Sequence, residues 1–178
     1  MRWIWIDRFV EFHSKQSARA VKNVSLAEDV LVQHFPGWPI MPASLMLEGL
    51  AQTGGILVGE ANDFREKVVL AKIPRAQFYT EVLAGHTLTY SVQLQYLRPE
   101  GALVLGQVET EGVRVAEAEI FFAHLDQSRS QQLFGERNFV FSGELKHLLG
   151  LAKLVAAANN ADAAPVSSPP PPPPPPAS

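Results

Sequence analysis

A glutamate on an otherwise apolar stretch is the first sign of chemistry in this sequence. Ser44, Glu48 and Gln52 follow one another at intervals of four residues, which places them on one stripe of a helix. A carboxyl group among apolar side chains gives up its proton less readily than one in water, so Glu48 is a candidate general acid and Gln52 a candidate for holding it. The same spacing also fits a Glu48 on an exposed edge of the helix, and it does not decide between the two interpretations.

A histidine stands just upstream, in a loop whose composition makes it stiff. Three prolines and Gly37 follow His34 before the helix begins, and proline fixes the backbone angle φ. Pro42 suits the first turn of a helix, where the amides of Ala43 and Ser44 would point outward with a partial positive charge. A neutral imidazole accepts a proton at physiological pH. Although a lone loop histidine is usually structural, the sequence here brings a base, an acid and anion-binding amides into one neighbourhood.

These groups need a helix that opens at Pro42 and runs to about Val58. Apolar residues fall on nearly every side of it, which is typical of a buried helix. They are Leu45, Met46, Leu47, Leu50, Ala51, Ile56 and Leu57. Gly49, Gly54 and Gly55 would each cost about 1 kcal/mol in an exposed helix. We therefore expect strands to press closely on these glycines.

The middle of the chain has the pattern of an antiparallel sheet. Apolar and polar residues alternate over 87–96, so one face of that strand is predicted to be buried. Turn residues then separate two further strands, over 102–110 and 113–124, which makes a meander. Weaker candidates cover 18–26 and 68–82, giving about five strands. The prediction is an α+β domain in which a curved antiparallel sheet wraps one buried helix.

The C-terminal part differs in composition from the rest. Leucines at helical spacing over 142–155, with Ser142 as a candidate N-cap, predict an amphipathic helix that packs on the body. An unbroken proline run over 169–176 predicts a polyproline II extension, to which we assign no role. The predicted division is a folded domain over 1–128, a helical extension over 129–158 and a disordered proline-rich tail over 159–178.

Composition and charge exclude several classes of function. The chain has 178 residues and a formal net charge of −3, so counterion release gives it no general attraction to nucleic acid. It has no cysteine, which excludes disulfides and thiolate nucleophiles and suits a reducing compartment. The apolar run at the N-terminus is too short for a signal peptide, and no run is long enough to span a bilayer. We expect a cytoplasmic protein without membrane insertion.

The remaining histidines show no spacing typical of metal ligands. They are His13, His86, His124 and His147. The sequence therefore predicts neither a metal site nor a cofactor.

The segment from His34 to Gln52 resembles the signature of the 3-hydroxyacyl-acyl carrier protein dehydratases of dissociated fatty acid synthesis. The resemblance extends to Asp7-Arg8, to Ala20-Val-Lys-Asn-Val24 and to Val115-Ala-Glu-Ala-Glu119. It implies a hot-dog fold with five or six strands and a homo-oligomer, either a dimer or a trimer of dimers. It also implies that the substrate is a 3-hydroxyacyl chain on acyl carrier protein, dehydrated to the trans-2-enoyl thioester without a cofactor.

The resemblance also implies individual roles. His34 corresponds to the catalytic histidine and Glu48 to the catalytic carboxylate, contributed by the opposite protomer. Ala43 stands where the family usually has a glycine whose amide binds the thioester carbonyl, with Pro42 and Gly37 as supporting loop residues. A related branch that also isomerises the double bond carries aspartate at the acid position, so a glutamate favours simple dehydration.

Two departures from the family pattern leave other functions open. Ala43-Ser44 replaces the usual Gly-Val, and Ala84-Gly85-His86 replaces a Pro-Gly-Asp turn, which predicts a relaxed loop there. The alternatives are a hot-dog acyl thioesterase and a non-catalytic subunit that binds acyl chains or the carrier protein. Fatty acid synthesis, a specialised lipid pathway and a polyketide pathway all fit.

Two weaker sets of residues complete the candidate site. Phe78 and Tyr79 are candidates for lining the substrate channel, but two aromatics at a strand end also fit plain core. A local basic cluster is a candidate surface for the acidic carrier protein, although each of its residues also fits a solvated loop. It consists of Arg65, Lys67, Lys72 and Arg75.

Overall fold

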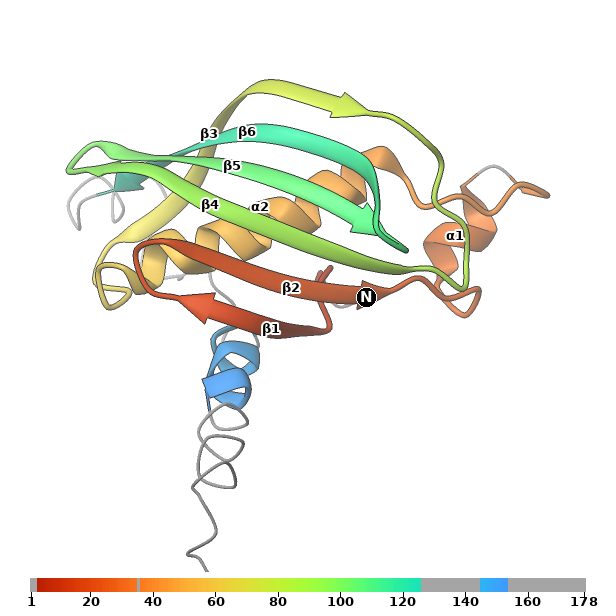
Figure 1. The fold of residues 1–178 in the computed structure, drawn as a ribbon, viewed down its shortest axis with the longest axis horizontal. Coiled ribbons are helices and arrows are strands. Elements are labelled where there is room, and N and C mark those ends of the chain that lie inside the picture. Colours follow the sequence, from red (N-terminus) through yellow and green to blue (C-terminus); the bar gives the residue numbers. More distant parts are fainter. Residues whose placement is uncertain (1–2, 35, 126–144, 154–178) are drawn as a thin grey trace, which may run out of the picture.

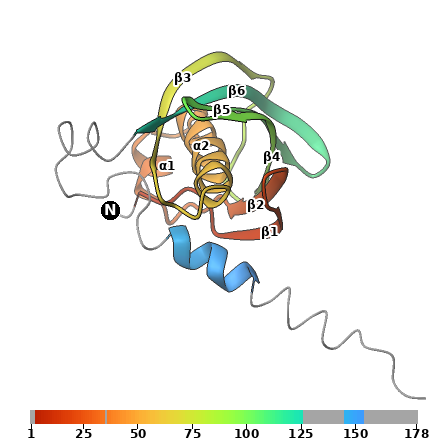
Figure 2. The same ribbon diagram turned by 90° about the vertical axis from the view of Figure 1, so that its left-hand side faces the viewer.

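A helix lies inside the curve of a six-stranded antiparallel sheet (Figures 1 and 2). The computed structural model describes residues 3–34, 36–125 and 145–153. The strands are ordered β1-β2-β4-β5-β6-β3 across the sheet. Their bounds are β1 (Arg8–His13), β2 (Ser17–Asn23), β3 (Lys67–Phe78), β4 (Thr87–Arg98), β5 (Gly101–Thr110) and β6 (Val113–Leu125). The helices are α1 (Asp29–Gln33) and α2 (Ala43–Glu60), and the predicted α+β class and sheet-wrapped helix are confirmed.

The predicted meander is confirmed as β4, β5 and β6, which pair antiparallel in sequence order. Leu88, Tyr90 and Val92 of β4 are buried as the alternation predicts, but Tyr96 is 38% exposed. The pairing of β4 with β5 shifts between Leu94 and Tyr96, so a bulge changes the alternation and the side chains at the end of the strand no longer point to the buried face. The expected burial is therefore wrong for this last part of β4.

The weaker strand candidates correspond to β2 and β3, and one further strand, β1, has no counterpart among the predictions. Only Phe9 of β1 is buried, and the pairing with β2 shifts between Phe9 and Glu11. A bulged strand at the edge of a sheet shows no clean alternation, which explains why periodicity missed it.

Gly49 and Gly54 of α2 lie where strands approach the helix, as expected. A Cβ atom on Gly49 would overlap the ring of Tyr90 on β4, and one on Gly54 would lie 3.2 Å from the ring of Phe122 on β6. Every residue from Gly49 to Gly59 is buried. The helix is therefore packed on all sides and can carry polar groups only where they find partners.

The described part of the predicted C-terminal helix, residues 145–153, is helical and packs on the body. Leu145 and Leu149 are buried in the core. Lys153 Nζ donates to Glu60 Oε1 over 2.9 Å, and Ser14 Oγ donates to Glu60 Oε2 over 2.7 Å. The helix is thus tied to the end of α2. The N-cap Ser142, the domain boundaries after 128 and 158 and the proline-rich tail lie outside the described residues.

Within the described ranges, none of the helices combines the length and the hydropathy that crossing a bilayer requires.

Replacing Gly49 by alanine should destabilise the protein by about 1–3 kcal/mol, because the added methyl group overpacks the contact with Tyr90. Gly150→Ala is the matched control, since a Cβ atom there meets nothing within 4 Å and alanine favours a helix by up to about 1 kcal/mol. Urea denaturation of both variants measures the difference. Equal stability of the two variants would contradict the close approach of β4 to α2.

The pair formed by Glu60 and Lys153 should make stability depend on pH. Burial raises the pKa of Glu60, but the hydrogen bonds from Lys153 and Ser14 outweigh it and hold the pKa below its ordinary value. The stabilisation is therefore present above the pKa of an unfolded glutamate, about 4.3, and is lost as pH falls through the lower pKa of the folded state. We expect Glu60→Gln to cost about 1 kcal/mol at pH 7 and less at pH 3, measured by urea denaturation. Glu100→Gln, the same change at the exposed turn before β5, should cost less at pH 7 than Glu60→Gln does.

Candidate active site

The loop that carries His34 is fastened to the body at several points. His34 is the C-cap residue of α1, and its amide donates to the carbonyl of Val30 over 3.0 Å. The amide of Met41 donates to the carbonyl of Val82 over 2.7 Å, and the Trp38 indole donates to Glu81 Oε2 over 3.0 Å. The described part of the loop between Phe35 and α2 is therefore held to the body.

Gly37 and Pro42 fit the loop in the way their chemistry suggests. Gly37 has a φ of +88°, in the region that favours glycine. Pro42 is the N-cap residue of α2 with a φ of −58°, and its carbonyl accepts from the amides of Leu45 and Met46. Both residues therefore have backbone conformations that their residue types favour.

The amides of Ala43 and Ser44 open α2, and both residues are exposed. Helix geometry gives the first amides no acceptor within the helix. Ala43 is not among the described residues with a positive φ, so its methyl group is compatible with the helical backbone. An alanine can therefore offer the same amide that a glycine would offer here.

Glu48 is half-buried, and its carboxyl group is held by two donors. Gln52 Nε2 donates to Glu48 Oε1 over 2.9 Å, and the Trp3 indole donates to the same oxygen over 3.0 Å. Both donors contact Oε1, so neither of them occupies Oε2. The hydrogen bond from Gln52 agrees with the holding role proposed for it.

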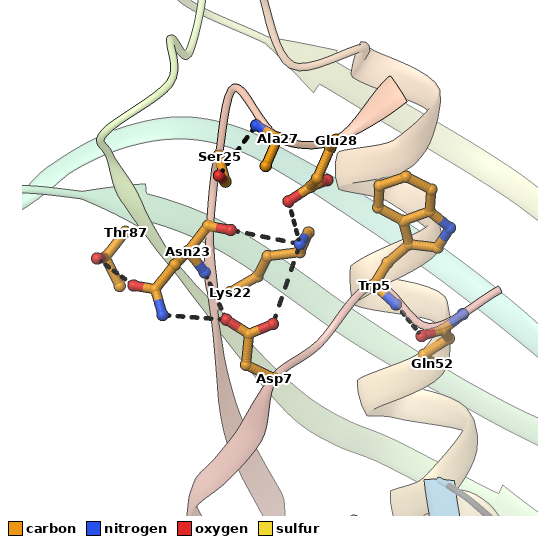
Figure 3. Close-up of polar contacts among 9 residues, drawn as sticks. All are labelled: Trp5, Asp7, Lys22, Asn23, Ser25, Ala27, Glu28, Gln52 and Thr87. Atoms are coloured by element: carbon orange, nitrogen blue, oxygen red, sulfur yellow. Dashed lines mark hydrogen bonds and ion pairs between the residues drawn. The ribbon is translucent and has the colours of Figure 1, made fainter. Parts of the chain in front are cut away.

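Gln52 is itself fixed by the N-terminal segment, residues 3–7. Its Oε1 accepts from the amide of Trp5 over 2.8 Å (Figure 3), and its Nε2 also donates to the carbonyl of Trp3 over 3.0 Å. The side chain is 8% exposed, so its amide group is paired at both ends in a buried position. Sequence reasoning missed the hydrogen bond from Trp3 to Glu48, because the two residues are 45 positions apart and no local spacing signals the contact.

Phe78 and Tyr79 lie on the surface of the chain, 43% and 53% exposed. The alternative interpretation as plain core is therefore wrong. The Tyr79 hydroxyl donates to Gln77 Oε1 over 3.0 Å, and its amide donates to the carbonyl of Val115 over 2.8 Å. The two aromatic rings are available to a partner or ligand at the end of β3.

The predicted basic cluster follows the edge strand β3 and the turn before it. Arg65 forms an ion pair with Asp63 over 3.4 Å, and Arg75 with Glu117 over 3.3 Å, and both arginines remain largely exposed. Lys72 Nζ lies 5.6 Å from the ring centroid of Phe121, while Lys67 opens β3. The cluster is therefore spread along a strand rather than gathered at one point.

The turn at Ala84-Gly85-His86 is not a relaxed loop, and that expectation is wrong. The amide of Gly85 donates to the carbonyl of Val24 over 2.8 Å, and the amide of Val24 donates to the carbonyl of His86 over 2.9 Å. His86 Nδ1 also accepts from the amide of Leu83 over 3.3 Å. These hydrogen bonds join the turn to the end of β2.

Known proteins resemble this chain in sequence and in fold. The model of the FabA-like domain matches residues 3–119, a range that includes the loop, α2 and most of the sheet. The 3-hydroxyacyl-acyl-carrier-protein dehydratase FabZ of Thermomicrobium roseum is 36% identical over 125 residues, which cover 70% of this chain and 84% of the relative. FabZ of Campylobacter lari is 37% identical over 123 residues, covering 66% and 84%.

Among solved structures, a hot-dog-like protein from Thermanaerovibrio acidaminovorans matches with a TM-score of 0.57 and 16% identity, over 71% of this chain and 96% of that one. At this identity the likeness establishes the fold alone, and the expected hot-dog fold is confirmed. The matched range, the level of identity and the fold agree, and the chain therefore belongs to the FabA-like family, which includes the 3-hydroxyacyl-acyl-carrier-protein dehydratases.

Proposed function

We propose that this protein removes water from (3R)-3-hydroxyacyl chains on acyl carrier protein and releases the trans-2-enoyl thioester, in fatty acid or related lipid biosynthesis. The similarity to FabZ dehydratases supports the reaction class. The observation that carries the proposal is the arrangement of Glu48, whose Oε1 is held by Gln52 and Trp3 so that Oε2 can present a proton. An acid held in this way is prepared to protonate a leaving hydroxyl group.

In this mechanism His34 takes the proton from C2 of the acyl chain, and the amide of Ala43 stabilises the negative charge that develops on the thioester oxygen. Glu48 gives its proton to the hydroxyl group on C3. The C3–O bond breaks, the C2–C3 double bond forms, and water leaves. His34 then holds the proton that Glu48 needs, and transfer between them through water restores both groups.

The proposal includes an assembly and a carrier surface. Glu48 of one protomer would serve His34 of its partner, in a homodimer or a trimer of dimers. The exposed rings of Phe78 and Tyr79 would line the channel for the acyl chain. The basic side chains of β3 and its preceding turn, chiefly the exposed Arg65 and Arg75, would face the acidic carrier protein. The absence of cysteine fits a cytoplasmic location.

Loss of the base or of the acid should stop dehydration. We expect His34→Ala and Glu48→Gln each to lower kcat by about 10²–10⁴, the usual contribution of general acid–base groups. The measurement is the absorbance of the enoyl thioester formed from 3-hydroxybutyryl or 3-hydroxydecanoyl carrier protein. His13→Ala and Glu100→Gln make the same chemical changes at exposed positions of the β1 end and the β4–β5 turn, and they should leave the rate unchanged.

Three outcomes would contradict the proposal. Wild-type rates in both site variants would remove the assigned roles. Release of free thiol from saturated as well as 3-hydroxyacyl thioesters would identify a thioesterase. Tight binding of acyl carrier protein without turnover of any substrate would identify a non-catalytic subunit.

The amide of Ala43 can be tested by a substitution that removes only its hydrogen. Proline suits the first position of a helix, and Pro42 has a ψ of 134°, which is compatible with a following proline. We therefore expect Ala43→Pro to fold normally and to lower kcat by about 10²–10³, the cost of losing an oxyanion donor. Ala43→Gly keeps the amide and should stay close to the wild-type rate. Equal rates in the two variants would exclude this amide from the reaction.

A further inference from the structure

A buried ammonium group lies between α1, which leads to His34, and the N-terminal segment, which orients Glu48 of the same chain. We infer that Lys22 is a positioning residue for the dehydration: its ion pair with Glu28 holds α1, and with it His34, against the N-terminal segment that orients Glu48. The inference rests on the proposed function for its effect on rate. Its structural part, the hold of Lys22 on α1, can be measured without any activity.

Lys22 lies on β2 with a side chain that is only 8% exposed, and carboxylates surround it (Figure 3). Its Nζ lies 2.8 Å from Glu28 Oε1 and 3.9 Å from Asp7 Oδ1, and it donates to the carbonyl of Asn23 over 3.3 Å. A buried charge is costly unless opposite charges and hydrogen bonds surround it, and removing one partner leaves the others uncompensated. Lys22 therefore keeps Glu28 and Asp7 in fixed positions.

The contact with Glu28 controls a helix that is too short to be stable alone. α1 has five residues, and Glu28 is its N-cap residue, yet the Glu28 side chain makes no capping hydrogen bond and reaches Lys22 instead. Leu31, fully buried, anchors the middle of α1. His34 ends it, through the bond of its amide to Val30. The ion pair of Glu28 and the buried side chain of Leu31 therefore fix the position of α1, and with it the position of His34.

The other side of Lys22 leads to Glu48. The ammonium group lies 5.6 Å from the ring centroid of Trp5, whose amide donates to Gln52 Oε1. Gln52 in turn donates to Glu48. Asp7, at the end of the same segment, accepts from the amide of Asn23 over 2.7 Å and so fastens the segment to β2. One series of contacts thus joins, within one chain, the helix that leads to His34 and the glutamine that holds Glu48, two side chains that serve different active sites of the proposed dimer.

A control with the same chemistry exists at the opposite end of α2. Lys153 also forms an ion pair with a glutamate, Glu60, but this pair contacts the end of α2 and the turn before β2. Lys153→Met should therefore lower the melting temperature without changing kcat. Lys22→Met makes the same substitution in a less exposed pair, so both variants are assayed where each is fully folded, and a remaining difference in kcat reports position rather than stability.

We expect Lys22→Met to lower kcat by about tenfold or more, with KM within about twofold, at a temperature where the variant is folded, because small misplacements of reacting groups cost rate. Lys22→Arg, which keeps the charge, should recover part of the loss. In a His34→Ala background Lys22→Met should have no further effect, since it acts through a group that is already absent. A wild-type kcat in Lys22→Met, or the same fractional loss in both backgrounds, would overturn the inference.

Hydrogen exchange separates this inference from the proposed function. Lys22→Met should speed exchange of the amides of α1 by about tenfold or more while α2 stays protected, as a locally opened element does. If Lys22→Met does not fold, Glu28→Gln removes the partner charge with little change of shape, and it should change kcat and exchange in the same direction. Faster exchange in a protein that dehydrates nothing would reject the proposed function alone, whereas unchanged exchange would reject the positioning role.

Discussion

The structure depends on the burial of α2, whose own buried polar side chains, Gln52 and Thr53, are both hydrogen-bonded. From Gly49 to Gly59 every residue of the helix is buried, and among them Gln52 carries a side chain that must find both donors and acceptors. The N-terminal segment supplies them through the backbone of Trp3 and Trp5. Burying the helix therefore requires this segment, and the segment then brings the Trp3 indole to Glu48.

Packing of the sheet and orientation of the acid are thus parts of one arrangement. Tyr90 of β4 contacts α2 at Gly49, directly after Glu48, which sets the distance between strand and helix at the level of the carboxyl group. Burial raises the pKa of Tyr90, with a further contribution from the negative charges of Asp7 and Glu28. Tyr90 therefore stays protonated where its ring packs on α2.

Periodicity predicted the elements whose patterns are long and regular, namely α2 and the meander of β4, β5 and β6. It missed β1, whose bulge breaks the alternation, and α1, whose five residues are too few to show a period. His34, Ala43, Glu48 and Gln52 were proposed from residue type and spacing, because they lie close together in the sequence. Trp3 was not, because its contact with Glu48 joins residues 45 positions apart. Lys22 appeared only within the family resemblance, since nothing in its neighbours marks a lysine for burial.

Glu48 and His34, the proposed acid and base, are held by elements of very different stability, and this difference explains why a buried ion pair lies beside the element that leads to His34. Glu48 lies on an 18-residue helix inside the core, where packing alone restricts its backbone. His34 follows a five-residue helix at the surface, which has little internal stability and a single fully buried anchor at Leu31. An ion pair whose lysine is 8% exposed and whose glutamate is 24% exposed is directional and screened less than a surface pair, so it can fix the start of such a helix where apolar contact cannot. Lys22 thus acts on α1, the less stable of the two elements, whose position depends most on a contact from outside the helix.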